Sequence, residues 1–183
     1  MILEQMFYYR PDRPGAPALI KPVLLTPETF APFGRVLRPG LGAVKTIRDG
    51  AVRLSQNPDF LDHDGDAVDL ALDFYDVAAH GARLDALQAE RHPHSAQLFV
   101  PLVEARYLVV VWPERPDAAD ALAFIGGPGQ AVIYKPGIWH HGIIALERQT
   151  SFASLLWRTK TGGDTEFFAL PSPVGIDLEG PAS

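Results

Sequence analysis

Cysteine is absent from this sequence, which excludes disulfides, cysteine-ligated zinc and a thiol nucleophile. No stretch approaches the ~18 uninterrupted apolar residues of a transmembrane helix. The segment from Met1 to Phe7 has neither the basic start nor the apolar run of a signal peptide. No block of lysine or arginine stands out, and the formal net charge is −6. We therefore expect a cytoplasmic protein that binds neither nucleic acid nor a membrane.

The remaining composition is that of one globular domain. The chain has 183 residues, and 47% of them are hydrophobic, which is enough for a core. Several prolines fall between Arg10 and Pro22, and proline fixes φ and lacks an N–H, so this segment is neither helix nor central strand. We expect a proline-rich arm over residues 1–21, a domain over 22–170 and a C-terminal tail over 171–183.

A short helix is predicted where the domain begins. Thr26 is a favourable N-cap and Pro27 stands at the preferred first position of a helix. Phe30 and Phe33 would then face the core, and Gly34 would end the element.

The rest of the chain is strand-like. Short apolar or alternating segments are separated by turn signals rich in proline and glycine, which is typical of a sandwich or barrel. No long amphipathic helix lies between them, which disfavours a doubly wound α/β fold. The predicted strands are Asp69–Val77, Gln97–Leu102, Tyr107–Trp112, Ala121–Ile125, Ala131–Tyr134 and Ser151–Trp157. We expect the strands Gln97–Leu102 and Ala131–Tyr134 to line one barrel.

Two segments carry chemistry. In the first, alternation along a strand places Glu90, His92 and His94 on one face. An acid and two imidazoles are costly to bury unless something satisfies them, and a transition metal is one such partner. A solvated polar face is the other interpretation, and this segment alone leaves both open.

In the second segment, a turn at Pro136-Gly137 precedes Trp139-His140-His141. Alternation allows only one of the two histidines to point inward.

Together these segments resemble the two motifs of the cupin superfamily, and in detail they resemble the ureidoglycolate lyase family within it. The shared features are ERHP at Glu90, Gln97, Phe99 and Pro101, WHH at Trp139, and Gly162-Gly163. The resemblance implies an all-β, cupin-type double-stranded β-helix, or jelly-roll barrel, with a short N-terminal helix. It also implies a homodimeric carbon–nitrogen lyase that cleaves ureidoglycolate to glyoxylate and urea in purine and allantoin catabolism.

The same resemblance places Glu90, His92, Gln97 and His140 on the cupin metal-ligand positions. A divalent transition metal is therefore expected, and its identity is left open. Glu90, His92 and His140 are also the catalytic candidates, since they could act directly as acid and base without a metal. Gln97 is at odd spacing from His92, so a bulge or turn between them must reset the alternation.

Other residues are candidates for binding the substrate. Lys135 and Arg158 could form charge-assisted bonds to its carboxylate, and His94 and Tyr134 could line the pocket. Arg91 alternates away from the site, which favours an ion pair or an interface, and His141 should pack outward or against a partner subunit.

Two further functions remain open at the level of sequence. One is a different cupin enzyme that acts on a small hydroxy or keto acid. The other is a non-catalytic, small-molecule-binding cupin, since a fold does not determine a function.

The proline-rich arm gives a first testable prediction. Deleting residues 1–17 should shift the melting temperature by less than about 2 °C, because the prolines supply few backbone donors to the domain. A thermal melt of the truncated chain at a concentration that keeps it monomeric measures this. A sharp fall would show that the arm belongs to the core.

Overall fold

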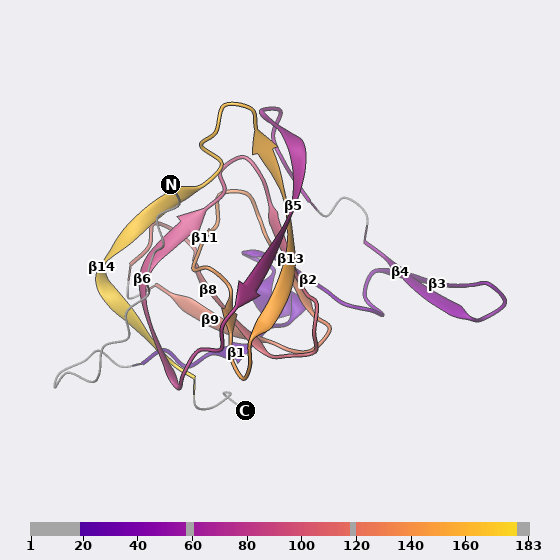
Figure 1. Ribbon diagram of the computed structural model, residues 1–183, viewed down its shortest axis with the longest axis horizontal. Coiled ribbons are helices and arrows are strands. Elements are labelled where there is room, and N and C mark those ends of the chain that lie inside the picture. Colours follow the sequence, from indigo (N-terminus) through magenta and orange to yellow (C-terminus); the bar gives the residue numbers. More distant parts are fainter. Residues whose placement is uncertain (1–18, 58–60, 118–119, 179–183) are drawn as a thin grey trace.

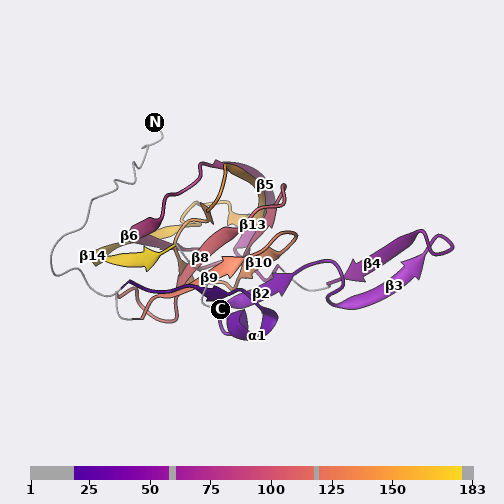
Figure 2. The same cartoon turned by 90° about the horizontal axis from the view of Figure 1, so that it is seen from below.

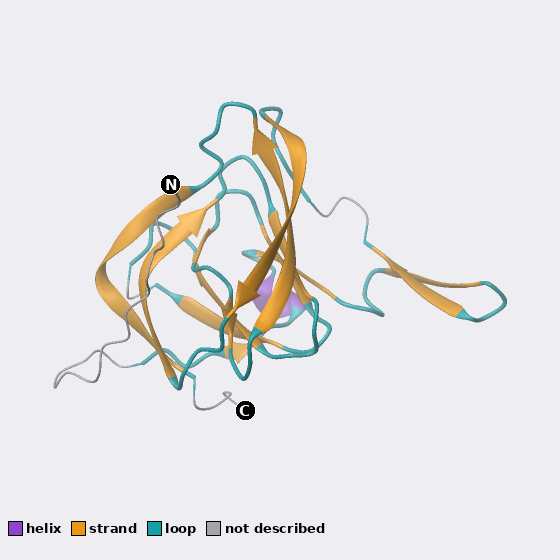
Figure 3. Ribbon diagram, viewed as in Figure 1, coloured by secondary structure: helices purple, strands orange, loops and turns teal. Residues whose placement is uncertain are grey.

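The computed structural model describes residues 19–57, 61–117 and 120–178. Within these ranges there are fourteen strands and one four-residue helix, which confirms the all-β prediction (Figures 1 and 3). No helix in the described ranges is long and apolar enough to span a membrane. The predicted arm lies outside these ranges up to residue 18, and Ile20, near its end, bridges to Ile176.

Two sheets face each other and form the cupin-type barrel. The first contains, in spatial order, β1 (Val23–Leu24), β9 (Leu122–Gly126), β8 (Tyr107–Trp112), β11 (Trp139–His140), β6 (Arg83–Arg91) and β14 (Glu166–Asp177), and β12 (Ile144–Ala145) also pairs with β8. The second contains β2 (Gly34–Leu37), β10 (Ala131–Tyr134), β7 (Gln97–Pro101), β13 (Thr150–Thr159) and β5 (Ala67–Val77). A separate hairpin of β3 (Ala43–Ile47) and β4 (Val52–Gln56) projects from the barrel (Figure 2).

The predicted strands correspond to β5, β7, β8, β9, β10 and β13, with ends that differ by a few residues at most. The two strands expected to line one barrel, β7 and β10, are antiparallel neighbours. The predicted domain boundary at residue 170 falls inside β14, whose final residues pair with β6 as far as Asp177. Only the end of β6, at Glu90, was expected to be a strand, and β1, β2, the β3–β4 hairpin, β12 and β14 have no counterpart among the predicted strands.

The predicted helix is present but shorter than expected. Helix α1 spans Pro27–Phe30, and the Thr26 side chain accepts a hydrogen bond from the Thr29 N–H as its N-cap. Phe30 and Phe33 are buried as predicted. The prediction that Gly34 ends the helix is wrong, because Gly34 begins β2. A glycine is needed there for close packing, since a Cβ at this position would lie 1.7 Å from the carbonyl oxygen of Ile133.

Aromatic side chains fill one end of the barrel. Phe99 and Phe152 contact each other edge-on with ring centroids 6.3 Å apart, and Phe152 contacts Tyr107 in the same way at 5.6 Å. Helix α1 adds Phe30, which packs edge-on against Phe124. Such geometry suits the charge distribution of aromatic rings. The apolar packing thus fills the barrel from one end, and polar side chains occupy the other.

The close approach at Gly34 gives a second prediction. Replacing it in Gly34→Ala should lower the free energy of unfolding by about 1–3 kcal/mol, because the new methyl group meets backbone that cannot move aside. Gly65→Ala is the matched control, since a Cβ there meets nothing within 4 Å. Chemical denaturation of both variants tests this, and equal stability would contradict the strand pairing of β2 with β10.

Candidate functional site

Three side chains of the metal-ligand type converge at the polar end of the barrel. Glu90 lies near the end of β6, and His140 pairs with it in register from β11. His92 follows directly after β6. Ligand atoms of the three residues all lie within 4.8 Å of one another. The first sheet therefore contributes an acid and two imidazoles to one point.

The facing sheet contributes Gln97. The chain leaves β6 after Arg91, crosses from one sheet to the other, and enters β7 at Gln97. This crossing is the change of direction that the odd spacing from His92 required. The Oε1 atom of Gln97 lies 3.2 Å from Nε2 of His140. All four residues predicted to converge are thus at the same place.

Backbone carbonyls determine which ring nitrogens carry protons. His140 Nδ1 lies 2.9 Å from the oxygen of Ile138, and His92 Nδ1 lies 3.0 Å from that of Asp164. A carbonyl oxygen only accepts, so each Nδ1 must donate. In the neutral imidazole Nε2 then carries a lone pair. The Nε2 of His92 is buried and has no hydrogen-bond partner among the described residues.

The Nε2 of His140 faces two oxygen atoms. These are Oε1 of Gln97 and Oε1 of Glu90, the latter at 3.5 Å. A lone pair directed at two acceptors is repulsive, and a metal ion, a proton on the ring or rotation of the Gln97 amide to donate its N–H would relieve the repulsion. Histidines that bind metals generally donate their other N–H to a carbonyl or carboxylate in this way. Two imidazole nitrogens, a carboxylate and an amide oxygen therefore fit a divalent transition ion.

Neighbouring groups hold the two rings in place. The Gly137 N–H donates to the carbonyl of His92 at 2.8 Å, which ties the turn before β11 to the end of β6. The Tyr134 ring stacks on His140 at 4.0 Å and 9°. The loop after β13 supplies the carbonyl of Asp164, and the carboxylate of Asp164 accepts from the Thr159 N–H at 2.6 Å. The sequence signal for this loop is the glycine pair that precedes Asp164.

Electrostatics favours an ionised Glu90 next to a neutral His92. Burial opposes ionisation of Glu90, but the hydrogen bond and charge of His140, with smaller effects from His92 and His141, outweigh it and lower the pKa of Glu90. Burial, together with the charge of His140, lowers the pKa of His92. The site therefore offers a carboxylate and an imidazole lone pair as proton acceptors.

The residues predicted to bind substrate lie in different places. Tyr134 is buried beside the cluster, and burial raises its pKa well above the usual range. Lys135 donates to the carbonyls of Ala31 and Pro32 after helix α1, at 2.7 and 3.1 Å. Arg158, on β13, forms an ion pair with Asp73 of β5 at 2.6 Å.

His94 lies apart from the cluster. It forms a 2.7 Å ion pair with Asp64 and belongs to a second group with Asp64 and Asp66, where its ring is partly exposed. His141 follows the last residue of β11, and its side chain is buried. Its charge acts on Glu90. The outward packing expected from alternation stays a prediction.

Two further residues were missed at the level of sequence. Tyr75 of β5 packs edge-on against Phe99 at 5.3 Å. Its pKa is raised by burial and by the charges of Glu90 and Asp73. Ser154 of β13 pairs with Phe99 and is fully buried, and its hydroxyl has no hydrogen-bond partner among the described residues. Neither residue lies in a motif, and only closure of the barrel brings them together.

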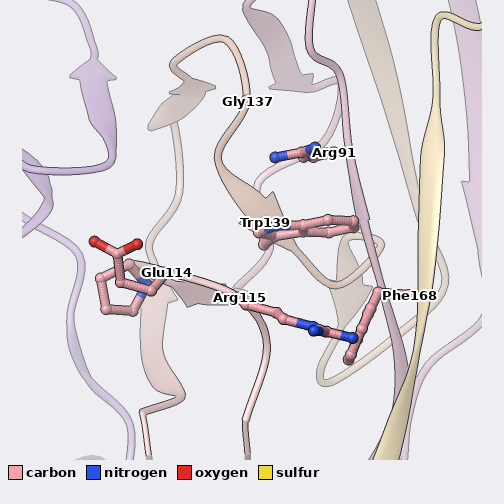
Figure 4. A pocket seen from close by; sticks show the side chains of 7 residues that line it. Arg91, Glu114, Arg115, Gly137, Trp139 and Phe168 are labelled. Carbon is pink, nitrogen blue, oxygen red and sulfur yellow. The ribbon is translucent and has the colours of Figure 1, made fainter.

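The opposite face of these strands forms a separate pocket of about 480 Å³ (Figure 4). Arg91 lies over the Trp139 ring at 4.6 Å and forms an ion pair with Glu166 at 2.6 Å. Arg115 lies over Phe168 at 4.8 Å. Arg91 therefore points away from Glu90 and His92 and makes an ion pair, as its alternation predicts.

Comparisons with known proteins agree on one family. The ureidoglycolate lyase family model matches residues 17–177. A relative from Agrobacterium fabrum is 33% identical over 158 residues, 84% of this chain and 92% of its own length. The ureidoglycolate lyase of Brucella anthropi is 28% identical over 86% of this chain and 94% of its own. A solved 3,4-ketoisomerase of Helicobacter canadensis has a TM-score of 0.45 at 10% identity, over 72% of this chain and 88% of its own.

The buried hydroxyl groups of Tyr134 and Ser154 give a third prediction. Tyr134→Phe and Ser154→Ala should leave the free energy of unfolding unchanged or raise it by up to about 1 kcal/mol, because each removes a buried hydroxyl that makes no hydrogen bond. Urea denaturation of the protein without ligand measures this. A loss of stability in either variant would mean that the hydroxyl has a partner in the free protein.

Proposed function

The chain belongs to the ureidoglycolate lyase family, and we propose that it cleaves ureidoglycolate to glyoxylate and urea at Glu90, His92, Gln97 and His140. The main support for this location is the geometry of His92 and His140. Their Nδ1 atoms donate hydrogen bonds to backbone carbonyls, and their rings are grouped with the carboxylate of Glu90. The reaction is a lyase reaction, because a carbon–nitrogen bond breaks without water or an oxidant.

The substrate sets what the site must do. Ureidoglycolate has a carboxylate and a carbon that bears a hydroxyl group and a ureido nitrogen. The hydroxyl loses its proton, its oxygen forms the carbonyl of glyoxylate, and the carbon–nitrogen bond breaks. The electron pair of that bond leaves with the ureido nitrogen, which takes up a proton to give urea. One proton acceptor near the hydroxyl and one donor near the nitrogen are therefore sufficient.

The chain's own groups can meet both needs. The lowered pKa of Glu90 keeps its carboxylate ionised near neutral pH, so it can accept the hydroxyl proton. An imidazole that receives this proton can return it to the departing nitrogen. A divalent ion held by Glu90, His92, Gln97 and His140 would supply a Lewis acid that lowers the pKa of the substrate hydroxyl.

Arg158 and Tyr134 are proposed to orient the substrate. Arg158 lies where β13 approaches the mouth of the barrel, and its charge also acts on Tyr75. A guanidinium there can bind the substrate carboxylate through charge-assisted hydrogen bonds. The Tyr134 hydroxyl is buried without a partner and can bind the ureido group. Lys135, His94 and Arg158 all have partners in the free protein, so a substrate would have to replace or share these partners.

The fourth prediction separates the histidines. His140→Ala should lower kcat/KM for urea release by about 10²-fold or more, because the site loses its central nitrogen. His141→Ala should retain more activity, since its ring is outside the ligand group. His63→Ala is the matched control, because His63 stacks on Trp157 and makes no contact with the cluster. Release of urea and of glyoxylate is measured for all three.

The same variants test whether the site binds a divalent metal ion. Elemental analysis after incubation with a divalent transition metal should find it in the wild-type protein and in His63→Ala, and much less in His140→Ala. Loss of activity at His141 equal to or greater than that at His140 would show that the wrong histidine is assigned to the site. Full activity of metal-free wild-type protein would leave the residues as direct acid and base.

A further inference from the structure

The pocket of about 480 Å³ on the outer face of the first sheet is separate from the catalytic candidates (Figure 4). Its lining comes from β11, β6 and β14 and from the segments next to β8 and β11. None of its residues belongs to the group formed by Glu90, His92 and His140. Pockets of this size hold small organic molecules. The side chains that line it indicate what kind of molecule fits.

Two aromatic rings form the apolar wall of the pocket. Trp139 of β11 and Phe168 of β14 meet edge to face, with ring centroids 5.9 Å apart. Both side chains are only partly buried, so they present ring surface to the pocket. A flat apolar molecule packs on such a wall through the same contacts that aromatic pairs make with each other.

A guanidinium group lies over each ring. Cζ of Arg91 is 4.6 Å from the centre of the Trp139 ring, and Cζ of Arg115 is 4.8 Å from the centre of the Phe168 ring. Stacking uses the face of a guanidinium group and leaves N–H donors along its edge. Arg91 also pairs with Glu166, whereas Arg115 makes no ion pair with any described residue. Arg115 is therefore the cation that can bind a new partner.

These cationic groups favour an anion. The chain has a formal net charge of −6, so an anion is attracted chiefly where positive side chains gather. Glu114 also lines the pocket, but its carboxylate points away from the Arg115 guanidinium (Figure 4). A guanidinium group binds a carboxylate or a phosphate through two parallel hydrogen bonds. The pocket thus combines one wall for a ring with one cation for an acidic group.

We propose that this pocket binds a small organic anion in which an acidic group is attached to a flat ring. The acidic group accepts hydrogen bonds from Arg115, and the ring packs against Trp139 and Phe168. An inorganic anion would use the cation and leave the aromatic wall bare. A neutral ring would use the wall and leave the cation without a partner.

The pocket lies directly behind the proposed catalytic site, and this step of the inference rests on the proposed function. Side chains alternate along a strand, so Arg91 and Glu90 of β6 face opposite ways, and so do Trp139 and His140 of β11. Glu90 and His140 pair in register. The same two strands therefore carry catalytic side chains on one face and pocket side chains on the other.

A ligand in the pocket holds these strands together. It connects Arg115, which follows β8, to Trp139 of β11 and Phe168 of β14. Gly137, another lining residue, donates to the carbonyl of His92 at 2.8 Å, so the turn before β11 belongs to both sites. Two sites that share structural elements change each other's affinity. Occupancy of the pocket is expected to lower KM for ureidoglycolate by about fivefold, with little change in kcat.

Binding is tested with para-fluorobenzoate, a flat ring with one carboxylate, followed by fluorine NMR. A titration of the wild-type protein should saturate, with a Kd of about 1 mM or lower. Cyclohexanecarboxylate has the charge without the flat ring, and benzyl alcohol has the ring without the charge. Each should displace the probe only at a concentration about fivefold higher or more than benzoate needs. No saturable binding, or equal displacement by all three, overturns the proposal.

Variants locate the bound probe. Arg115→Gln changes an exposed side chain and should raise the Kd by about tenfold or more, and Arg115→Lys, which keeps the charge without the fork, should give an intermediate value. Arg106→Gln is the matched control, because Arg106 is an exposed arginine outside the pocket that pairs with Glu147. His140→Ala should bind the probe like the wild type. Binding that is lost in His140→Ala and kept in Arg115→Gln would place the anion inside the barrel and overturn the proposal.

Kinetics of urea release tests the coupling. Saturating para-fluorobenzoate should lower KM for the wild type and for Arg106→Gln and leave KM of Arg115→Gln unchanged. A KM that does not change in the wild type, or that rises equally in all three proteins, would overturn the coupling. Probe binding is measured without ureidoglycolate. An inactive protein that still binds the probe through Arg115 would therefore refute the proposed function and leave the pocket assignment standing.

Discussion

The chemistry of the site depends on where the Nδ1 protons of His92 and His140 are bound. Each is donated to a backbone carbonyl, so the main chain rather than a side-chain network fixes both rings. The two carbonyls belong to Asp164 and Ile138, which come from different parts of the fold. The lone pairs on Nε2 therefore point inward only once β11, β6 and the loop after β13 are assembled. A change in any of these segments would alter the site without touching a ligand.

This arrangement lowers the free energy of unfolding of the protein without ligand. The Nε2 of His92 and the hydroxyls of Tyr134 and Ser154 are buried without hydrogen bonds. A buried polar group left unsatisfied costs about 1–3 kcal/mol. The opposite end of the barrel offsets this through close aromatic packing, and every residue of β8 is buried. The unsatisfied atoms of His92 and Tyr134 beside His140 indicate a site that becomes complete when a ligand binds.

Strand alternation made most of the site predictable from the sequence. It placed Glu90 and His92 on one face and showed that Gln97 needed a change of direction to join them. That change is a crossing between sheets, which spacing alone could not distinguish from a bulge. Tyr75 and Ser154 were not predictable, because their places in the barrel arise from closure of the sheets and not from a local pattern.

The elements of the fold also divide into those that the sequence predicts and those that it does not. The buried strands carry apolar runs that a sequence reveals, whereas the hairpin has polar and apolar residues in near balance and no core to bias them. A glycine at position 34 has two explanations, the end of a helix or close packing against another strand. Only the approach of the Ile133 carbonyl, which the sequence does not show, decides for the second. Contacts made by backbone atoms of distant residues leave no periodic signal in the sequence.

Strand β5 has two different sides. Its inner side carries Asp73 and Tyr75, whose charge and ring interact with Arg158 and Phe99. Its outer side carries exposed apolar residues, and as an edge strand it has a neighbour in its sheet on one side only. Because Asp73 pairs with Arg158, this one strand links the exposed edge of its sheet to a proposed substrate-binding residue. A change in β5 can therefore reach the site without altering any residue of the ligand group.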